Sequence, residues 1–272
     1  MSELHTRIDV KDGVATVTLN RPERMNAWTA QMGVELNEHL VRCDEADEVR
    51  AVIVTGAGRA FCAGADLERG GETFAGGGND PAPRPRRTIL PWEVRKPIIA
   101  AINGAAVGVG MTLPLQYDIR VAAKDAKLGF LFVRRGIMTE LSSTWILPRL
   151  VGIARAADLL LSGRIVLGEE AAALGLVNEA VETAQVLQRA QEIARSIAEN
   201  CAPLSVALTK RMIWEHLGGP PPVEVARREA KALWALGRMA DSREGVQSFL
   251  EKRKPRWSLS PTKDMPDIPS LD

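Results

Sequence analysis

The chain has 272 residues, a formal net charge of +1, and a composition that is 46% hydrophobic and 25% charged. This composition is that of an ordinary soluble globular protein, and the small net charge argues against a broad basic face for nucleic acid. No apolar run approaches the roughly 20 residues that span a bilayer, and the N-terminus carries no targeting signal, so we expect no membrane partner and a cytoplasmic location.

The cysteines and histidines are few and scattered. The three cysteines, Cys43, Cys62 and Cys201, lie far apart in the chain, which fits a reducing compartment. The three histidines show no spacing typical of metal ligands, so we predict no metal site. Cys62 lies close to the candidate pocket described below, but its apolar neighbours favour a packing role.

Two short runs near the N-terminus alternate apolar and polar residues. Residues 8–10 and 14–19 flank Lys11-Asp12-Gly13, and Asp-Gly between alternating runs predicts a two-stranded hairpin. Thr29 then stands where its side chain can cap a helix that we expect to end near Asp44, because apolar residues recur there at helical spacing.

The segment from Ala51 to Leu67 carries the first sign of a binding site. Residues 51–54 are apolar and β-branched and predict a buried strand, followed by a break. The small residues 63–65 precede Asp66, so a ligand could approach the backbone closely. If Asp66 and Leu67 begin a helix, its free N–H groups favour negative charge and could stabilise an enolate. The alternative is a strand and a turn without chemistry.

A second glycine cluster favours the chemical interpretation. Residues 101–110 hold Gly104, Gly108 and Gly110 and follow the apolar run 97–102. Two units that each pass from a strand through glycine to a helix can contribute one N–H apiece to the same oxygen.

The middle of the chain alternates loops with short elements. Residues 68–87 are rich in glycine and proline, which predicts either a lid or a surface insertion. The elements expected next are the end of a helix at 90–95, strands at 97–102, 118–122 and 127–130, and a buried helix at 111–116 containing Pro114.

The second half is increasingly helical. We expect a helix to start near Glu140 and to end or kink at Pro148, and helices to dominate from residue 184 to residue 252. Strands that alternate with helices, followed by helices alone, predict an α/β core with a helical C-terminal region.

Three parts of the sequence together resemble the crotonase, or enoyl-CoA hydratase/isomerase, superfamily. They are residues 19–27, the two glycine-containing segments above and residues 249–255. The resemblance implies a crotonase (ClpP-like) spiral of ββα units with a C-terminal helical trimerisation region. We place an acyl-CoA-binding core at 1–200, the helical region at 201–255 and a tail at 256–272. It also implies a homotrimer or a dimer of trimers.

The resemblance further implies which groups bind the substrate, an acyl group carried as a coenzyme A thioester. The oxyanion-hole donors are the backbone N–H groups of Ala65 and Val109, where valine replaces the family's usual glycine. No separate cofactor is needed because coenzyme A arrives on the substrate. Phe249 and Lys252 match positions that reach a neighbouring subunit's coenzyme A. The residues expected to bind the carrier or the substrate are Arg24, Met25, Ala27, Ala63, Ala65, Asp66, Leu67, Glu68, Phe249 and Lys252.

The resemblance also suggests which group moves protons. Hydratases of this superfamily use two glutamates, whose positions fall here on Thr112 and Phe132, and neither side chain is a base at neutral pH. Residues 136–148 resemble the segment of Δ3,Δ2-enoyl-CoA isomerases in which one acid opens a helix, which implies Glu140 as the catalytic acid/base. Such an enzyme removes a proton at C2 of a 3-enoyl thioester and returns it at C4. Thr112, Phe132 and Met138 are then expected in the acyl pocket.

Several alternatives stay open at this point. A helix N-terminus lowers the pKa of a carboxylate whereas an apolar pocket raises it, so Glu140 is either a base or a solvated first-turn acid. The runner-up activity is that of an enoyl-CoA hydratase or a related lyase. The alternative of another class is a non-catalytic relative that binds coenzyme A or RNA.

Overall fold

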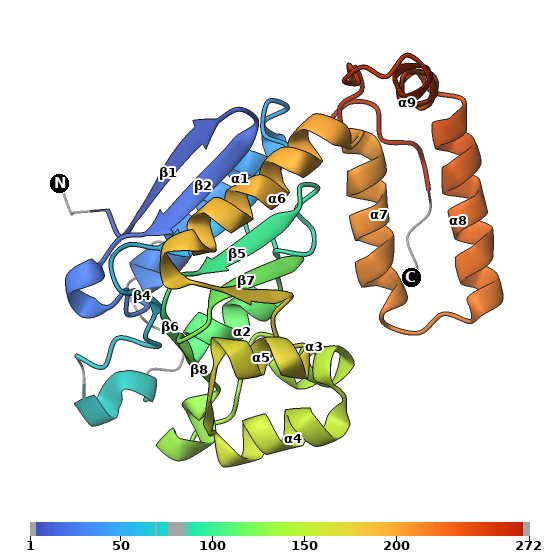
Figure 1. Cartoon of the computed structure of the whole chain (residues 1–272). Coiled ribbons are helices and arrows are strands. Elements are labelled where there is room, and N and C mark those ends of the chain that lie inside the picture. Colours follow the sequence, from blue (N-terminus) through green and yellow to red (C-terminus); the bar gives the residue numbers. More distant parts are fainter. Residues whose placement is uncertain (1–3, 69, 76–84, 86, 269–272) are drawn as a thin grey trace.

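The computed structural model describes residues 4–68, 70–75, 85 and 87–268. The strands form two sheets (Figure 1). The large sheet has the order β1 (Thr6–Lys11), β2 (Val14–Leu19), β3 (Ala51–Gly56), β5 (Ile98–Ile102), β7 (Ile119–Ala123) and β10 (Glu179–Val181). The small sheet has the order β4 (Ala60–Cys62), β6 (Ala105–Val107), β8 (Lys127–Gly129) and β9 (Ile165–Leu167).

The chain alternates between these two sheets. Each of β3, β5 and β7 lies in the large sheet, and the strand that follows it, β4, β6 or β8, lies in the small sheet. Pairing from β2 to β10 is parallel, and β1 joins antiparallel through the turn at Asp12-Gly13. The chain thus passes from the large sheet to the small sheet three times in succession, which confirms the expected α/β spiral.

The helices cover the sheets and extend the chain. They are α1 (Ala30–Glu45), α2 (Val109–Leu115), α3 (Ser143–Val151), α4 (Ile153–Ser162), α5 (Gly168–Leu174), α6 (Val186–Asn200), α7 (Pro203–His216), α8 (Pro222–Gly237) and α9 (Ala240–Leu250). Short 3-10 helices are η1 (Pro22–Arg24), η2 (Gly70–Phe74), η3 (Leu131–Arg135) and η4 (Thr183–Gln185).

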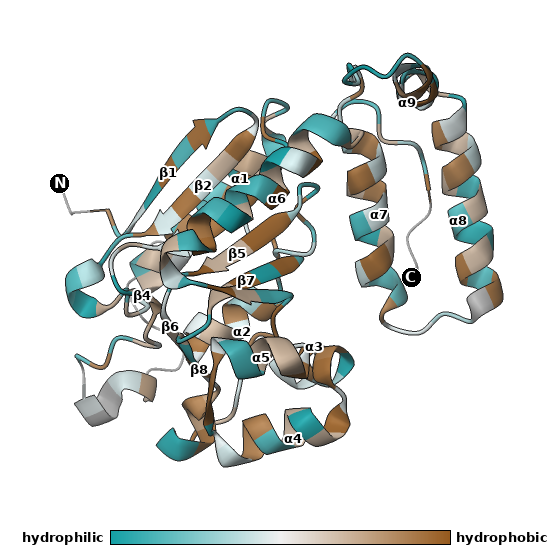
Figure 2. Ribbon diagram, viewed as in Figure 1, coloured by the Kyte–Doolittle hydropathy of each residue, from teal (hydrophilic) through white to brown (hydrophobic). Residues whose placement is uncertain are grey.

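The core lies between the large sheet and its helices. Every residue of β5 is 0% exposed, as expected for a central parallel strand that is covered on both faces. Helix α6 buries Val186, Ala190 and Ala194, which recur every fourth residue and form one stripe facing the sheet. Figure 2 shows the consequence, with hydrophobic strands beneath α6 and hydrophilic residues on the helix's outer side.

Most expected elements are confirmed, and several are corrected. The hairpin and the helix capped by Thr29, whose hydroxyl accepts a hydrogen bond from Met32 N at 3.1 Å, are present. Residues 90–95 form turns and no helix. Helix α2 begins at Val109, before the expected start, and α3 continues beyond Pro148 to Val151. Most of the proposed lid at 68–87 lies outside the described residues.

Helices α7, α8 and α9 form an arm that projects from the sheets (Figure 1). A small apolar cluster of Leu208, Met212, Ala232 and Ile268 joins α7 and α8 to the returning C-terminal segment. One buried ion pair ties the arm to the core, because Lys210 Nζ lies 2.8 Å from Asp118 Oδ2. The division into units at residues 200 and 255 stays a prediction.

Removal of the Lys210–Asp118 ion pair is expected to destabilise the protein. Lys210→Met leaves the partly buried Asp118 carboxylate without its cation, and we expect the free energy of unfolding in urea to fall by about 3 kcal/mol. Lys124→Met is the matched control, since Lys124 pairs with Glu182 at the same 2.8 Å but both side chains are about half or more exposed. Equal midpoints for the two variants would show that burial of the Lys210 pair contributes nothing.

Candidate functional site

Two glycine turns bring the predicted oxyanion donors together. Gly64 follows β4 with φ of 100°, and Gly108 follows β6 with φ of 58°. Because β4 and β6 are parallel neighbours, their carboxyl ends lie at the same edge of the small sheet. A Cβ on Gly108 would lie 3.8 Å from the Gly64 Cα, which shows how closely the two turns approach.

The N–H groups of Ala65 and Val109 are both available in a shared cavity. The cavity has a volume of about 370 Å³, and both residues line it. Val109 is the first residue of α2, where N–H groups have no intrahelical acceptor. Within the described residues, neither N–H donates a hydrogen bond to a backbone or side-chain acceptor. Both can therefore bind an oxygen of a ligand.

The local structure around Ala65 differs from the sequence expectation. Asp66 does not begin a helix, and Ala65 instead forms an isolated parallel bridge with Trp28. The Asp66 carboxylate is held by Arg21 at 2.8 Å and by the Glu68 N–H at 3.1 Å. Burial opposes ionisation of Asp66, but these hydrogen bonds outweigh it and keep the Asp66 pKa below its usual range. Asp66 therefore holds the loop in shape and remains ionised.

Glu140 lies on the wall of the same cavity, ahead of α3 and outside it. This corrects the expected helix start, because α3 begins at Ser143. Leu141 and Ser142 separate the two and both adopt left-handed backbone angles, with φ of 52° and 57°. Each such residue costs about 1–2 kcal/mol, so the surrounding structure must impose this conformation. The Gln116 side chain contributes by donating to Leu141 O at 3.3 Å.

The environment of Glu140 favours a proton-transfer group. The residue is exposed as a whole, but burial of its carboxyl group raises the pKa above the usual glutamate value, and the nearby Thr112 hydroxyl, which also donates to Gly108 O at 3.4 Å, partly opposes that rise. Glu140 lies outside a helix, and among the described residues no ion pair or charged neighbour is a cause of its pKa shift. A carboxyl pKa moved toward neutrality suits a group that must both accept and return a proton.

The predicted acyl-pocket residues divide into two sets. Phe132 and Met138 line the cavity. Thr112 is 0% exposed and is not among the lining residues, but it is close enough to Glu140 to influence the pKa of that carboxyl group, and its place in the acyl pocket stays a prediction. The sequence interpretation missed six lining residues that carry side chains and that no spacing rule would have selected: Trp28, Phe74, Val107, Leu131, Arg135 and Ile137.

The expected carrier-binding residues of the N-terminal half lie beside one another at the cavity's edge. Arg24 pairs with Glu68 at 2.9 Å, and both side chains are largely exposed. Met25 O accepts from Ala63 N at 3.1 Å, and Ala27 O accepts from the Arg21 side chain at 2.8 Å. Of the whole predicted group, Ala63, Ala65 and Leu67 line the cavity itself.

Phe249 and Lys252 lie far from this cavity within one chain. Phe249 is on α9, which lies beside the start of α7 and away from the small sheet (Figure 1); it is 81% exposed and borders a different hollow with Leu204 and Trp257. Lys252 follows the end of α9. The structure of a single chain therefore does not bring these two residues to Ala65, Val109 and Glu140.

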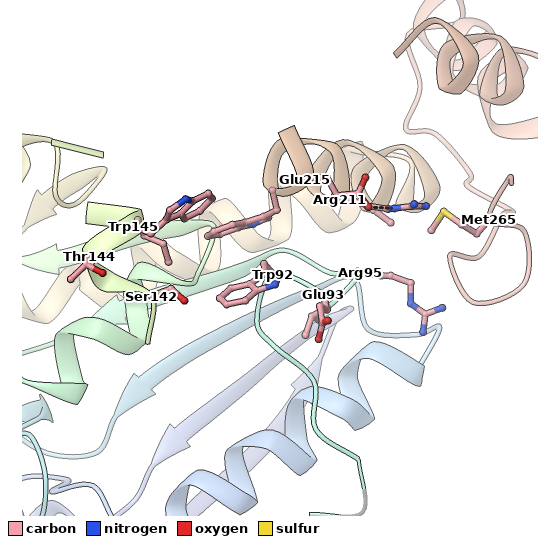
Figure 3. A pocket seen from close by; sticks show the side chains of 13 residues that line it. Trp92, Glu93, Arg95, Ser142, Thr144, Trp145, Arg211, Glu215 and Met265 are labelled. Carbon is pink, nitrogen blue, oxygen red and sulfur yellow. Dashed lines mark hydrogen bonds and ion pairs between the residues drawn. The ribbon is translucent and has the colours of Figure 1, made fainter. Parts of the chain in front are cut away.

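A second, larger cavity lies between α7 and the core (Figure 3). It has a volume of about 780 Å³ and is lined by Trp92, Trp145 and Trp214 together with Arg211 and Glu215, which pair with each other. It contains none of the predicted site residues. Ser142, one of its lining residues, is two positions after Glu140, which lines the first cavity.

Other expectations concern groups outside the site. The Cys62 side chain is buried, and burial raises its thiol pKa to about 11, which makes it a poor nucleophile and fits a packing role. Across the described ranges, no three His, Cys, Asp or Glu side chains cluster as metal ligands would. No helix in the same part of the chain is long and apolar enough to cross a membrane.

Comparison with known proteins identifies the family. The sequence model of the enoyl-CoA hydratase/isomerase family matches residues 9–260. "Enoyl-CoA hydratase AFT3-1" of Alternaria alternata is 40% identical over 256 residues, which are 90% of this chain and 83% of that protein. "1,2-epoxyphenylacetyl-CoA isomerase" of Escherichia coli K12 is 36% identical over 255 residues, covering 92% and 96% of the two chains.

A solved structure extends the comparison to the fold. A probable enoyl-CoA hydratase/isomerase from Mycobacterium abscessus superimposes with a TM-score of 0.87 at 39% identity, over 93% of this chain and 98% of that one. The chain belongs to the enoyl-CoA hydratase/isomerase family of the crotonase superfamily. It is an acyl-CoA enzyme of that family.

The contact between Thr112 and Glu140 predicts a titration effect. Thr112→Val removes a hydrogen bond that favours the carboxylate, so the Glu140 pKa, already raised by burial, is expected to rise further. We would follow the carboxyl resonance by ¹³C NMR of glutamate-labelled protein and assign it with Glu140→Gln. Thr112→Ser, which keeps the hydroxyl, should titrate close to the wild type. An unchanged Thr112→Val titration would contradict the contact.

Proposed function

We propose that this enzyme moves a double bond in an acyl-CoA thioester, as a Δ3,Δ2-enoyl-CoA isomerase does. One observation carries the proposal: among the described residues that line the cavity with the Ala65 and Val109 N–H groups, Glu140 is the one carboxylate. Double-bond migration needs one group that removes and returns a proton. Water addition by two glutamates would need a second acid, and Thr112 and Phe132 stand at those positions.

The reaction follows from the placement of these groups. The thioester oxygen accepts hydrogen bonds from the Ala65 and Val109 N–H groups. Glu140, as the carboxylate, takes a proton from C2 of the 3-enoyl thioester, and the electron pair moves onto the oxygen to give an enolate. The protonated Glu140 then delivers the proton to C4, which yields the trans-2-enoyl thioester. Each oxyanion donor contributes roughly 3 kcal/mol to such a transition state.

Glu140 limits the pH range of this reaction. A base must be ionised, so activity falls as the pH drops through the Glu140 pKa, which burial raises. The same raised pKa also helps the protonated Glu140 to keep its proton until it delivers that proton to C4 in the second step. The acid limb of the rate profile is therefore expected above the usual titration range of an exposed glutamate.

A hydratase is the second candidate, because the Alternaria relative carries the name of one. In that case Glu140 would activate water alone, since Thr112 and Phe132 cannot share the task. The predicted site offers no partner acid in the described cavity wall. This chemical argument favours migration over hydration.

The carrier site is proposed to need a second chain. Phe249 is exposed on the arm and remote from Glu140 in its own chain, which supports the expectation that Phe249 and Lys252 reach a neighbour's coenzyme A. A homotrimer or a dimer of trimers, which the family resemblance implies, is the assembly we propose. Coenzyme A arrives on the substrate, so the enzyme requires no cofactor of its own.

Glu140→Gln tests the chemistry. We expect migration of the 3-hexenoyl-CoA double bond to fall by roughly three orders of magnitude or more, because the amide cannot remove a proton. Glu182→Gln, which changes an exposed acid paired with Lys124, is the control and should retain full activity.

The wild type and Glu140→Gln are also assayed for hydration of crotonyl-CoA. Little hydration by the wild type supports an isomerase. Hydration that survives Glu140→Gln would mean that other groups carry the reaction and that the proposed assignment is wrong.

A Phe249→Ala/Lys252→Ala double variant tests the shared carrier site. Loss of one aromatic ring and one cation should raise KM for 3-hexenoyl-CoA by about tenfold and leave kcat nearly unchanged, since neither side chain lies near Glu140 in its own chain. Sedimentation would verify that the assembly is retained. An unchanged KM in an intact assembly would refute the shared site.

A further inference from the structure

We propose that Arg135 is a specificity residue that binds an anionic group, most simply a carboxylate, on the acyl part of the substrate. The inference rests on the proposed function because it takes the cavity beside Glu140 to be the acyl site. It concerns the class of acyl group and leaves the proton transfers unchanged.

The cavity wall explains why one cation there is significant. Its described side chains are largely apolar or aromatic, with Trp28, Phe132 and Ile137 among them, and the charged ones are Arg135 and Glu140. An acyl group that ends in an aliphatic chain or a phenyl ring would need only contact with the apolar walls. A guanidinium adds five N–H donors in a planar fork that matches a carboxylate or a phosphate.

Arg135 has no carboxylate partner among the described residues. Its one hydrogen bond in that part of the chain runs from Nη1 to the neighbouring Arg134 O at 3.4 Å. The other arginines near the site are occupied, since Arg21 pairs with Asp66 and Arg24 with Glu68. The Arg135 fork is therefore free to meet an anion that enters the cavity.

Arg135 is also not the counter-ion of Glu140. The two residues form no ion pair, and the influences on the Glu140 carboxyl are burial and the Thr112 hydroxyl. A cation close to Glu140 would lower its pKa and weaken it as a base. Because the two residues are not paired, the site can hold an anionic group at Arg135 without neutralising the group that moves protons.

The position of Arg135 assigns it to the acyl side of the cavity. It ends η3, next to Gly136 with φ of 71°, and shares the segment 131–140 with Phe132 and Glu140. The expected carrier contacts lie on other segments, at residues 24–27 and 63–68. A thioester whose oxygen meets Ala65 and Val109 thus has its acyl chain along the wall that carries Arg135.

Binding of matched thioesters tests the proposal. Calorimetry would compare adipyl-CoA, which ends in a carboxylate, with hexanoyl-CoA of the same chain length and with free coenzyme A. In the wild type we expect adipyl-CoA to bind more tightly than hexanoyl-CoA. Arg135→Gln should weaken adipyl-CoA by about tenfold or more, as for loss of a charged hydrogen bond, and hexanoyl-CoA by less than about twofold.

Two variants make the result specific. Arg134→Gln is the matched control, because Arg134 donates to Ser162 O at 3.0 Å and does not line the cavity, and its affinities should equal those of the wild type. Arg135→Lys should recover part of the adipyl-CoA affinity, since it restores charge without the fork. Retained hexanoyl-CoA binding shows that each variant is folded.

The contrary outcomes are distinct. Equal weakening of all three ligands by Arg135→Gln would assign the guanidinium to a coenzyme A phosphate and overturn the proposal. No weakening would make Arg135 a solvated surface residue and also overturn it. Both thioesters are saturated, so the result does not depend on double-bond migration, and failure of the Glu140 assays would remain a separate finding.

Discussion

The close contact between the start of α2 and the end of β4 is the constraint on which the site depends. A Cβ on Gly110 would fall 2.1 Å from Cys62 O, and one on Gly104 would fall 2.1 Å from Arg59 O. Only glycine therefore permits the second glycine segment to lie directly against the first. Because of that contact, Val109 N–H and Ala65 N–H open into one cavity.

Two acids close to this cavity show how the surroundings decide the role of a carboxyl group. Asp66 meets Arg21 and a backbone N–H, which keep its pKa low in spite of burial. Glu140 meets a hydroxyl and apolar surroundings, and burial raises its pKa. Environments that push two pKa values apart separate a structural acid from an acid/base candidate. The left-handed residues Leu141 and Ser142 belong to the same arrangement, because they detach Glu140 from the helix that would lower its pKa.

The arm adds a different kind of organisation. The buried Lys210 ties it to Asp118 of the core, and a small apolar cluster joins α7 and α8 to the C-terminal segment, while α9 lies distant from the sheets (Figure 1). The residues proposed for the carrier and those proposed for proton transfer are therefore separated within one chain. A shared site between chains is the arrangement that reconciles the two, and the exposed Phe249 supports it.

The sequence by itself determined the features that depend on local pattern. The Asp12-Gly13 hairpin, the Thr29 cap, the buried strands and the C-terminal helices follow from turn chemistry and periodicity. The motifs also indicated the family and directed attention to Ala65, Val109 and Glu140. Errors arose where tertiary contacts override local preference, as in the turns at 90–95 and the extended backbone at Asp66.

Only the tertiary structure decided which distant side chains meet. It placed Thr112 close to Glu140, moved the start of α3 to Ser143 and brought Trp28 and Arg135 to one cavity. These residues are far apart in the chain, and no spacing rule joins them. Their proximity follows from glycine contacts between successive turns of the spiral, because backbone packing between strands fixes where each side chain lies.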